Sequence, residues 1–247
     1  MGITRRRFVA GATGALAGVA WRPASIKAIA FDAFAIFDPK SVFALADAMY
    51  PGAGLSDEWR TRQFEYTWLR VAARRYADFW HVTEDALVFA ANRLKLTLSP
   101  GSRTTLMNEF LSLSVWPDAM PALESIKRSG VRLALLSNFT PRMLAANIAN
   151  AGLHGIFEHV LSTDQVKSYK PDPRAYQIGM DALKTRRGEV LFAAFAGWDA
   201  AGAKLFGYPT FWVNRQKLPG EEMGASPDGS GETLEDLVEF LMRRVTR

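Results

Sequence analysis

From residue 118 onward, short apolar runs rich in β-branched and aromatic residues alternate with segments that have the spacing of amphipathic helices. The runs are Val131–Asn138, His159–Thr163, Glu189–Phe195 and Tyr208–Asn214, and another of the same kind, Ile26–Phe31, precedes them. Strands that alternate with helices pair in parallel, because each return of the chain needs a helical crossover. The sequence therefore predicts an α/β fold, a doubly wound, Rossmann-like parallel sheet with helices on both faces.

The segment between the first run and residue 118 has helical spacing almost throughout. Aromatic residues recur along it at Trp59, Phe64 and Trp68, and no β-prone run interrupts it before Trp116. We therefore expect a core domain of residues 23–50 and 118–247, with an all-helical cap subdomain, residues 51–117, inserted after the first strand. The polar, glycine-rich segment 219–232 is expected to be a surface loop.

The first 22 residues carry most of the excess positive charge. The chain has 30 Lys and Arg against 25 Asp and Glu, a net charge of +5. Residues 1–22 hold four arginines and no acid, so the remainder balances at +1 (26 against 25), which argues against nucleic acid as a partner. Arg5-Arg6-Arg7-Phe8 and the weakly apolar GATGALAGVA resemble a twin-arginine export signal. This segment predicts export to the periplasm, and it is too short for a permanent membrane span.

The residue types present exclude several kinds of site. The chain has no cysteine, which excludes disulfides, thiolate metal sites and cysteine nucleophiles. Its three histidines, His81, His154 and His159, do not show the i, i+4 spacing of metal ligands. These residue types argue against a zinc site. We expect neither a metal nor another cofactor, on the grounds given below for Phe34 and Lys170.

Polar residues follow several of the predicted strands. Asp32 ends the first apolar run, Ser137 and Asn138 end the second, and Asp199 follows the run that begins at Glu189. In an open parallel sheet, ligands bind in the crevice outside the carboxyl ends of the strands, so these side chains are expected to meet there. The alternative for each is a plain structural role, such as an Asp32 that only caps the following turn.

These residues stand in motifs that resemble a known family. The motifs are FDAFAIFD…SV (31–42), EYTWLR (65–70), LSN (136–138), YKPDPRAY (169–176), WDAAGAKLFGYPTFWVNR (198–215) and EEMG…PD (221–228). From Ile26 onward the chain resembles the haloacid dehalogenase (HAD) superfamily and, within it, the type II (S)-2-haloacid dehalogenases. The resemblance also suggests a homodimer.

The resemblance implies a role for each candidate residue. Position by position, it implies a nucleophile at Asp32, groups that hold its carboxylate at Ser137 and Lys170, and a water-activating acid at Asp199. It further implies substrate-binding residues that line the same site, namely Asn138, Phe34, Tyr176 and Trp198.

Phe34 favours dehalogenation over phosphate-ester hydrolysis. In phosphatases of this superfamily, the corresponding motif resembles DxD. Its second Asp protonates the leaving alkoxide, and a metal offsets the phosphate charge. Here that position holds Phe34, whereas a halide leaves without a proton. We therefore expect a metal-independent hydrolytic dehalogenase of small 2-haloalkanoic acids. It would act through an ester of Asp32, with Lys170 as the fixed cation, and release a 2-hydroxy acid and halide.

Two other functions stay open at this point. One is another HAD-type hydrolase, phosphatase-like. The other is a non-catalytic periplasmic binding protein, because Ala53, Ala194 and Ala196 stand where the resemblance leads us to expect polar or charged side chains. A replacement cation could come from one of three basic residues, Lys40, Arg60 and Arg62.

Overall fold

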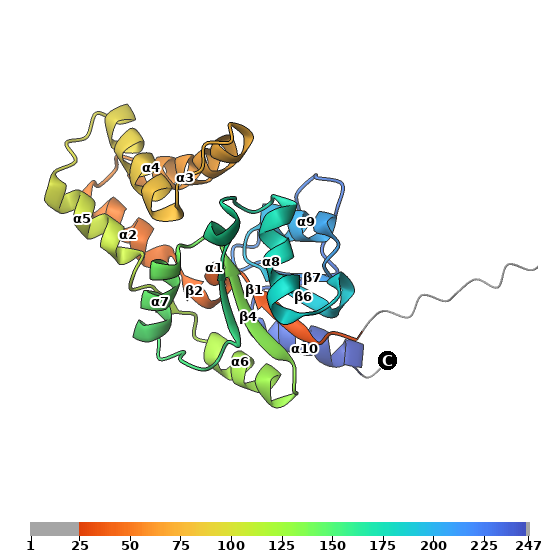
Figure 1. Cartoon of the computed structure of the whole chain (residues 1–247). Coiled ribbons are helices and arrows are strands. Elements are labelled where there is room, and N and C mark those ends of the chain that lie inside the picture. Colours follow the sequence, from red (N-terminus) through yellow and green to blue (C-terminus); the bar gives the residue numbers. More distant parts are fainter. Residues whose placement is uncertain (1–24, 246–247) are drawn as a thin grey trace, which may run out of the picture.

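The computed structural model describes residues 25–245 and shows a six-stranded, all-parallel sheet in the order β5-β4-β1-β6-β7-β8 (Figure 1). Its strands are β1 (Ala28–Phe31), β4 (Arg132–Ser137), β5 (His159–Ser162), β6 (Val190–Ala194), β7 (Thr210–Val213) and β8 (Gly229–Gly231). The predicted α/β, doubly wound architecture is thus confirmed. However, β8 lies in the segment expected to be a loop, because Gly-Ser-Gly has no apolar side chain and joins the sheet edge only through its backbone.

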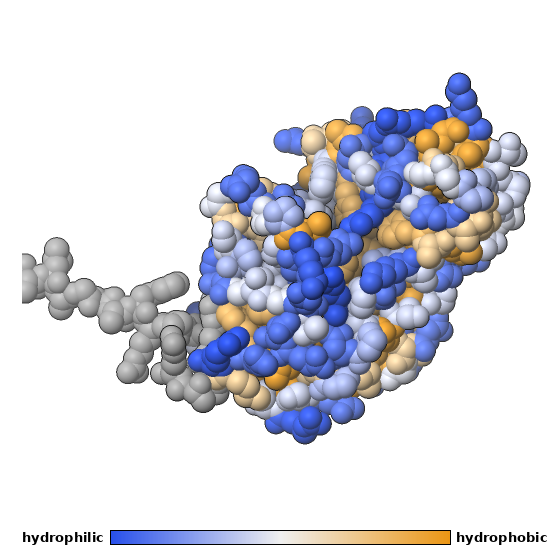
Figure 2. Space-filling model, turned by 180° about the vertical axis from the view of Figure 1, so that it is seen from behind, coloured by the Kyte–Doolittle hydropathy of each residue, from blue (hydrophilic) through white to orange (hydrophobic). Residues whose placement is uncertain are grey.

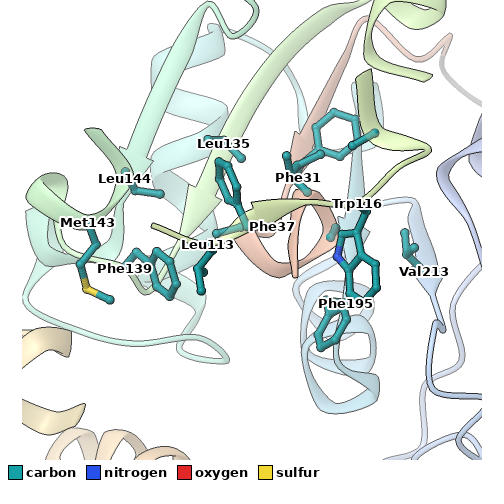
Figure 3. Close-up of a cluster of buried hydrophobic side chains, with 14 of the residues drawn as sticks. Phe31, Phe37, Leu113, Trp116, Leu135, Phe139, Met143, Leu144, Phe195 and Val213 are labelled. Atoms are coloured by element: carbon teal, nitrogen blue, oxygen red, sulfur yellow. The ribbon is translucent and has the colours of Figure 1, made fainter. Parts of the chain in front are cut away.

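Helices cover both faces of the sheet, and strand side chains alternate between two apolar layers. In β1, Ile29 and Phe31 point into the larger layer, whereas Ala28 and Ala30 point into the smaller one. The larger layer, part of which Figure 3 shows, is covered by α6 (Ala119–Arg128), α7 (Pro141–Asn150) and α10 (Leu234–Val245). The smaller layer is covered by α8 (Pro173–Leu183) and α9 (Gly197–Phe206).

A second group of helices stands beside the sheet domain and consists of α2 (Lys40–Met49), α3 (Leu55–Ala72), α4 (Phe79–Arg93) and α5 (Pro100–Glu109) (Figure 1). Trp59 of α3 is fully buried within this group, and its indole Nε1 donates to the Thr83 carbonyl of α4 at 2.8 Å. The predicted boundary at residue 51 stays a prediction. Helix α2 packs against α3 and α5 and buries Val42 and Ala46, so its packing partners belong to the helical group.

Two short strands join the cap to the sheet domain. β2 (Phe37–Asp38) and β3 (Ser114–Val115) pair antiparallel, one on the way out to the cap and one on the way back. β2 follows β1 after one turn of helix, α1 (Ala33–Ile36). Trp116 follows β3, and its Nε1 donates to the Phe34 carbonyl at 2.9 Å. This hydrogen bond connects the segment that returns from the cap to helix α1. The cap is therefore attached immediately after β1, at the carboxyl edge of the sheet.

Two short 3₁₀ turns, η1 (Thr163–Val166) and η2 (Arg187–Glu189), complete the described elements. Within residues 25–245, no helix has the length and apolar character needed to cross a membrane. On the face seen in Figure 2, hydrophobic residues lie scattered among hydrophilic ones over both the cap and the sheet domain. The predicted export signal, residues 1–22, lies outside the described residues.

Candidate active site

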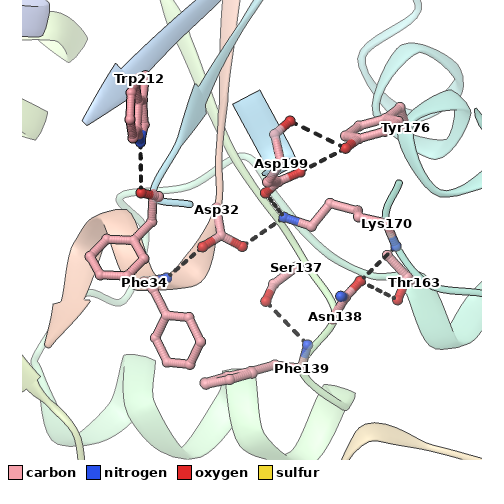
Figure 4. Close-up of polar contacts among 11 residues, drawn as sticks. Asp32, Phe34, Ser137, Asn138, Phe139, Thr163, Lys170, Tyr176, Asp199 and Trp212 are labelled. Atoms are coloured by element: carbon pink, nitrogen blue, oxygen red, sulfur yellow. Dashed lines mark hydrogen bonds and ion pairs between the residues drawn. The ribbon is translucent and has the colours of Figure 1, made fainter. Parts of the chain in front are cut away.

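Asp32 stands at the carboxyl end of the buried central strand β1. One carboxylate oxygen, Oδ2, accepts a hydrogen bond from the Phe34 backbone N–H at 3.0 Å and so caps α1. The capping role foreseen for Asp32 is therefore real, but it uses one oxygen only. The other oxygen, Oδ1, faces Lys170 (Figure 4), and the residue keeps 8% of its surface exposed toward a cavity.

Lys170 lies between two carboxylates (Figure 4). Its Nζ donates to Asp32 Oδ1 at 2.7 Å and to Asp199 Oδ2 at 2.5 Å. Asp199 comes from the first turn of α9, beyond β6, and its other oxygen accepts from the Tyr176 hydroxyl at 2.7 Å. Lys170 and Asp199 are each only 1% exposed, so low-dielectric surroundings strengthen these interactions. Residues far apart in sequence thus form one chain of charged hydrogen bonds.

Burial and neighbouring charges shift the pKa values of Lys170, Asp199 and Tyr176. Burial raises the pKa of the Asp199 carboxyl to about 6, although the positive charge of Lys170 acts in the opposite direction. Burial by itself would lower the pKa of Lys170, but the charges of Asp199 and Asp32 outweigh it and raise that pKa above its ordinary value. Burial also raises the pKa of Tyr176 well above its usual range, so Tyr176 donates its proton as a neutral phenol. Asp199 therefore titrates nearer to neutrality than an ordinary aspartate.

Ser137 ends β4 beside Asp32, and Asn138 follows the strand. The Ser137 hydroxyl accepts from the Phe139 N–H at 3.1 Å, and among the described residues no hydrogen bond joins it to Asp32. Its predicted role in holding that carboxylate stays a prediction. Asn138 Oδ1 accepts from the backbone N–H of Lys170 at 3.0 Å and from the Thr163 hydroxyl at 3.2 Å. Asn138 thus fixes the segment that carries the lysine.

A cavity of about 400 Å³ opens over these groups, between the sheet edge and the cap. Its lining includes seven of the eight predicted site residues: Asp32, Phe34, Ser137, Asn138, Lys170, Trp198 and Asp199. Tyr176 lies behind Asp199 and outside that lining, where it contacts the acid and not the cavity. The structure therefore brings the predicted set together and leaves Tyr176 as a supporting residue.

Arg60, on α3 of the cap, lines the cavity, whereas the sequence alone left it as one of three candidate cations. It faces the cavity and donates to the Gln216 side chain at 3.2 Å. Arg62 instead pairs with Glu58 and Glu65. Arg60 precedes Phe64 by one helical turn, and that spacing was the available signal for its position.

The other candidates for a cation lie elsewhere. Lys40 sits over the Trp116 ring, 4.9 Å from its centroid, and Ala53 is absent from the described cavity lining. An arginine is therefore present in the cavity, although not at position 53.

No group of three or more His, Asp or Glu side chains within the described part of the chain is placed to hold a metal ion. Between the Asp32 and Asp199 carboxylates the position is taken by the Lys170 ammonium. Lys170 thus offsets part of the negative charge of the two acids.

Comparisons with known proteins agree with this geometry. The family model of haloacid dehalogenase-like hydrolases matches residues 68–207. The (S)-2-haloacid dehalogenase of Pseudomonas sp. strain YL is 43% identical over 218 residues, which cover 87% of this chain and 94% of that enzyme.

Solved structures show the same fold along most of the chain. L-2-haloacid dehalogenase RSc1362 superposes with a TM-score of 0.87 at 41% identity, covering 89% of this chain and 100% of that one. The Xanthobacter autotrophicus L-2-haloacid dehalogenase with chloropropionic acid covalently bound gives a TM-score of 0.80 at 34% identity, covering 88% and 98%. The chain therefore belongs to the haloacid dehalogenase-like hydrolases and, within them, to the (S)-2-haloacid dehalogenase family.

Proposed function

We propose that the protein is a hydrolytic dehalogenase that converts small 2-haloalkanoic acids into 2-hydroxy acids and halide. The observation that carries this proposal is the Asp32 carboxylate, balanced by the Lys170 ammonium at 2.7 Å and aimed into a cavity that also holds Arg60. The chain is 43% identical to an (S)-2-haloacid dehalogenase, which supports the same reaction here.

The first step is a displacement at the carbon that bears the halogen. A carboxylate oxygen of Asp32 forms a bond to C2 of the substrate while the carbon–halogen bond breaks, and the halide leaves with the bonding electron pair. The attack comes from the side opposite the halogen, so the configuration at C2 inverts. Arg60 supplies a fixed guanidinium in the cavity for the substrate carboxylate. Burial lowers the pKa of Arg60 while Asp57 opposes this, and an arginine stays protonated at neutral pH.

The second step hydrolyses the ester. Water attacks the carboxyl carbon of Asp32, and Asp199 accepts the water proton as general base. The backbone N–H of Phe34 and the ammonium of Lys170 each donate to an Asp32 oxygen, so both can stabilise the negative charge of the tetrahedral intermediate. Its collapse releases the product oxygen, which takes up the proton held by Asp199. The water oxygen stays in the Asp32 carboxyl group, which loses the second water proton to solvent and becomes a carboxylate again.

Phe34 makes phosphate-ester hydrolysis the weaker alternative. Its ring packs at 5.1 Å from the Phe139 ring and 5.8 Å from the Phe195 ring, which gives the site an apolar wall two residues after Asp32. A side chain there cannot protonate a leaving alkoxide, and a halide needs no proton. The same wall helps to exclude bulk water from the ester.

Halide release from 2-chloropropanoate tests the proposal directly. The wild-type protein should release chloride at the same rate with and without EDTA, because Lys170 rather than a metal balances Asp32. Asp32→Asn should abolish release, and intact-mass analysis should detect an adduct on wild-type Asp32 in rapid quench. Asp38→Asn is the matched control, since Asp38 accepts from the backbone N–H of Lys40 and lies outside the cavity lining. No chloride and no adduct from any short haloacid would instead indicate a non-catalytic protein.

Localisation and assembly are proposed on sequence grounds. We infer that residues 1–22 direct export of the folded protein to the periplasm. Replacement of Arg5, Arg6 and Arg7 by lysine should retain the protein in the cytoplasm in cell fractionation, and unchanged export would contradict this. The family resemblance supports a homodimer, for which sedimentation analysis of the purified protein is the test.

A further inference from the structure

The cavity is larger than a short haloacid requires. Its volume of about 400 Å³ falls in the range of 300–1,000 Å³ that is typical of sites for drug-sized ligands. Eight aromatic side chains are among the lining residues, so much of the wall is apolar. The groups that perform the reaction lie on one side of it, at the sheet edge. This leaves an aromatic chamber that the proposed reaction at C2 does not use.

Six of the eight aromatic side chains form two clusters that line the cavity. The inner cluster, Phe34, Phe139 and Phe195, comes from the sheet domain, with ring centroids 5.1 and 5.8 Å apart around Phe34. The rim cluster joins Trp198 of the sheet domain to two residues of cap helix α3 and consists of Phe64, Trp68 and Trp198.

The rim cluster is built around the Trp198 ring. That ring lies 5.5 Å from both the Phe64 and the Trp68 rings, in edge-to-face arrangements. Trp68 keeps 38% of its surface exposed, so a bound apolar group can still cover part of it. Aromatic side chains thus line the chamber, an environment that suits a flat apolar group.

Helix α3 sets the direction in which a ligand would extend. Arg60, Phe64 and Trp68 are spaced four residues apart and all line the cavity, so they share one face of the helix. At a rise of 1.5 Å per residue, the backbone advances about 12 Å from Arg60 to Trp68. The face of α3 that lines the cavity therefore carries a guanidinium at one end and aromatic rings at the other. The distance between them is roughly the length of an aryl-substituted acid.

We propose that the preferred substrates are 2-haloacids with an aromatic ring on the side chain of C2. The carboxylate would face Arg60, C2 would face Asp32, and the ring would lie along Phe64 and Trp68, next to Trp198. This inference rests on the proposed dehalogenase function, which it narrows from small haloacids in general to an arylalkyl class. The ring contributes binding through apolar burial and edge-to-face contacts.

The kinetic test compares kcat/KM for 2-bromo-3-phenylpropanoate with that for 2-bromopropanoate. We expect the ring-bearing acid to be favoured at least about ten-fold, the lower end of what differences in apolar contact achieve in enzyme pockets. Trp68→Ala should lower this ratio about ten-fold. Leu69→Ala is the matched control, because Leu69 is its neighbour on α3, is exposed and lies outside the lining, and the ratio should not change. 2-Bromohexanoate should fall between the other two acids.

A binding measurement keeps the inference testable apart from turnover. Unreactive 3-phenylpropanoate should quench tryptophan fluorescence of the wild-type protein at a concentration at least about ten-fold lower than propanoate does, and Trp68→Ala should reduce that difference. Equal affinities would overturn the inference. Turnover of 2-bromopropanoate with little or none of the ring-bearing acid would overturn it while leaving the dehalogenase function intact. No halide from any of the three acids would refute the function itself.

Discussion

Replacing Lys170 by methionine removes the positive charge that lies between two buried carboxylates. The ammonium is 2.7 Å from Asp32 and 2.5 Å from Asp199, and the lysine side chain is 1% exposed. Loss of one partner from a buried ion pair costs about 3–5 kcal/mol, because the remaining charge is left uncompensated. Methionine has a similar length and no charge, so the loss is mainly electrostatic. For a chain of this size, Tm should fall by about 6–20 °C, at 2–4 °C per kcal/mol.

The loss should depend on pH in a defined direction. Without Lys170, burial and the negative charge of Asp32 raise the pKa of Asp199 in the folded state further above its unfolded value. A carboxyl with a raised folded pKa favours folding at low pH, where it is protonated, and this contribution disappears as pH rises through the folded pKa. The deficit of Lys170→Met should therefore be larger at pH 8 than at pH 5.

Urea unfolding followed by tryptophan fluorescence, at both pH values, measures this difference. Adding Asp199→Asn to Lys170→Met should recover part of the lost stability, because one of the two charges is then gone. Lys204→Met is the control, since Lys204 pairs with Asp228 at 2.8 Å with side chains 35% and 22% exposed. Such a pair is worth up to about 1 kcal/mol. A loss below about 1 kcal/mol for Lys170→Met at pH 8, or an equal loss at both pH values, would refute the reasoning.

Three further substitutions probe other parts of the site. Because the pKa of Asp199 is raised to about 6, hydrolysis of the ester in single-turnover assays should decline as pH falls through 6. Tyr176→Phe removes a hydrogen bond worth about 0.5–1.5 kcal/mol from the Asp199 carboxylate and should shift that decline upward by about 0.4–1.1 pH units; no shift, or a shift to lower pH, would count against Asp199 as the base. Arg60→Gln should raise KM for haloacids more than ten-fold with a smaller effect on kcat, and an unchanged KM would remove Arg60 from carboxylate binding. Trp116→Phe loses the bond to the Phe34 carbonyl and should lower the free energy of unfolding by about 0.5–1.5 kcal/mol in urea titrations; wild-type stability would show that this bond contributes nothing.

The sheet and the position of the site were predictable because both follow from local patterns. Apolar runs such as Ile26–Phe31 and Val131–Asn138 indicate strands, and parallel strands bring their carboxyl ends to one edge. Asp32, Ser137 and Asp199 therefore had to lie near one another. Strands without an apolar signal were not predictable: β8 is Gly-Ser-Gly, and it forms only because β7 offers a free backbone edge.

Contacts between distant segments were beyond local patterns. The approach of Lys170 to Asp32 joins residues 138 positions apart, and its 2.7 Å geometry depends on Asn138, which holds the backbone of Lys170. From the sequence alone, Arg60 was one of three basic candidates. Helical spacing shows which residues share a face of α3, but it does not show which face lies toward the sheet domain. The packing of α2 against α3 and α5 was out of reach for the same reason, because it is a tertiary contact.

The paired strands β2 and β3 have a consequence for exchange between proteins. They bring the two places where the polypeptide crosses into and out of the helical subdomain side by side. A foreign helical insert with closely spaced ends can therefore be transplanted between Asp38 and Ser114 without stretching the backbone. Such a chimaera would take the reacting residues Asp32 and Lys170 from the parent of the sheet domain and its substrate selectivity from the parent of the cap.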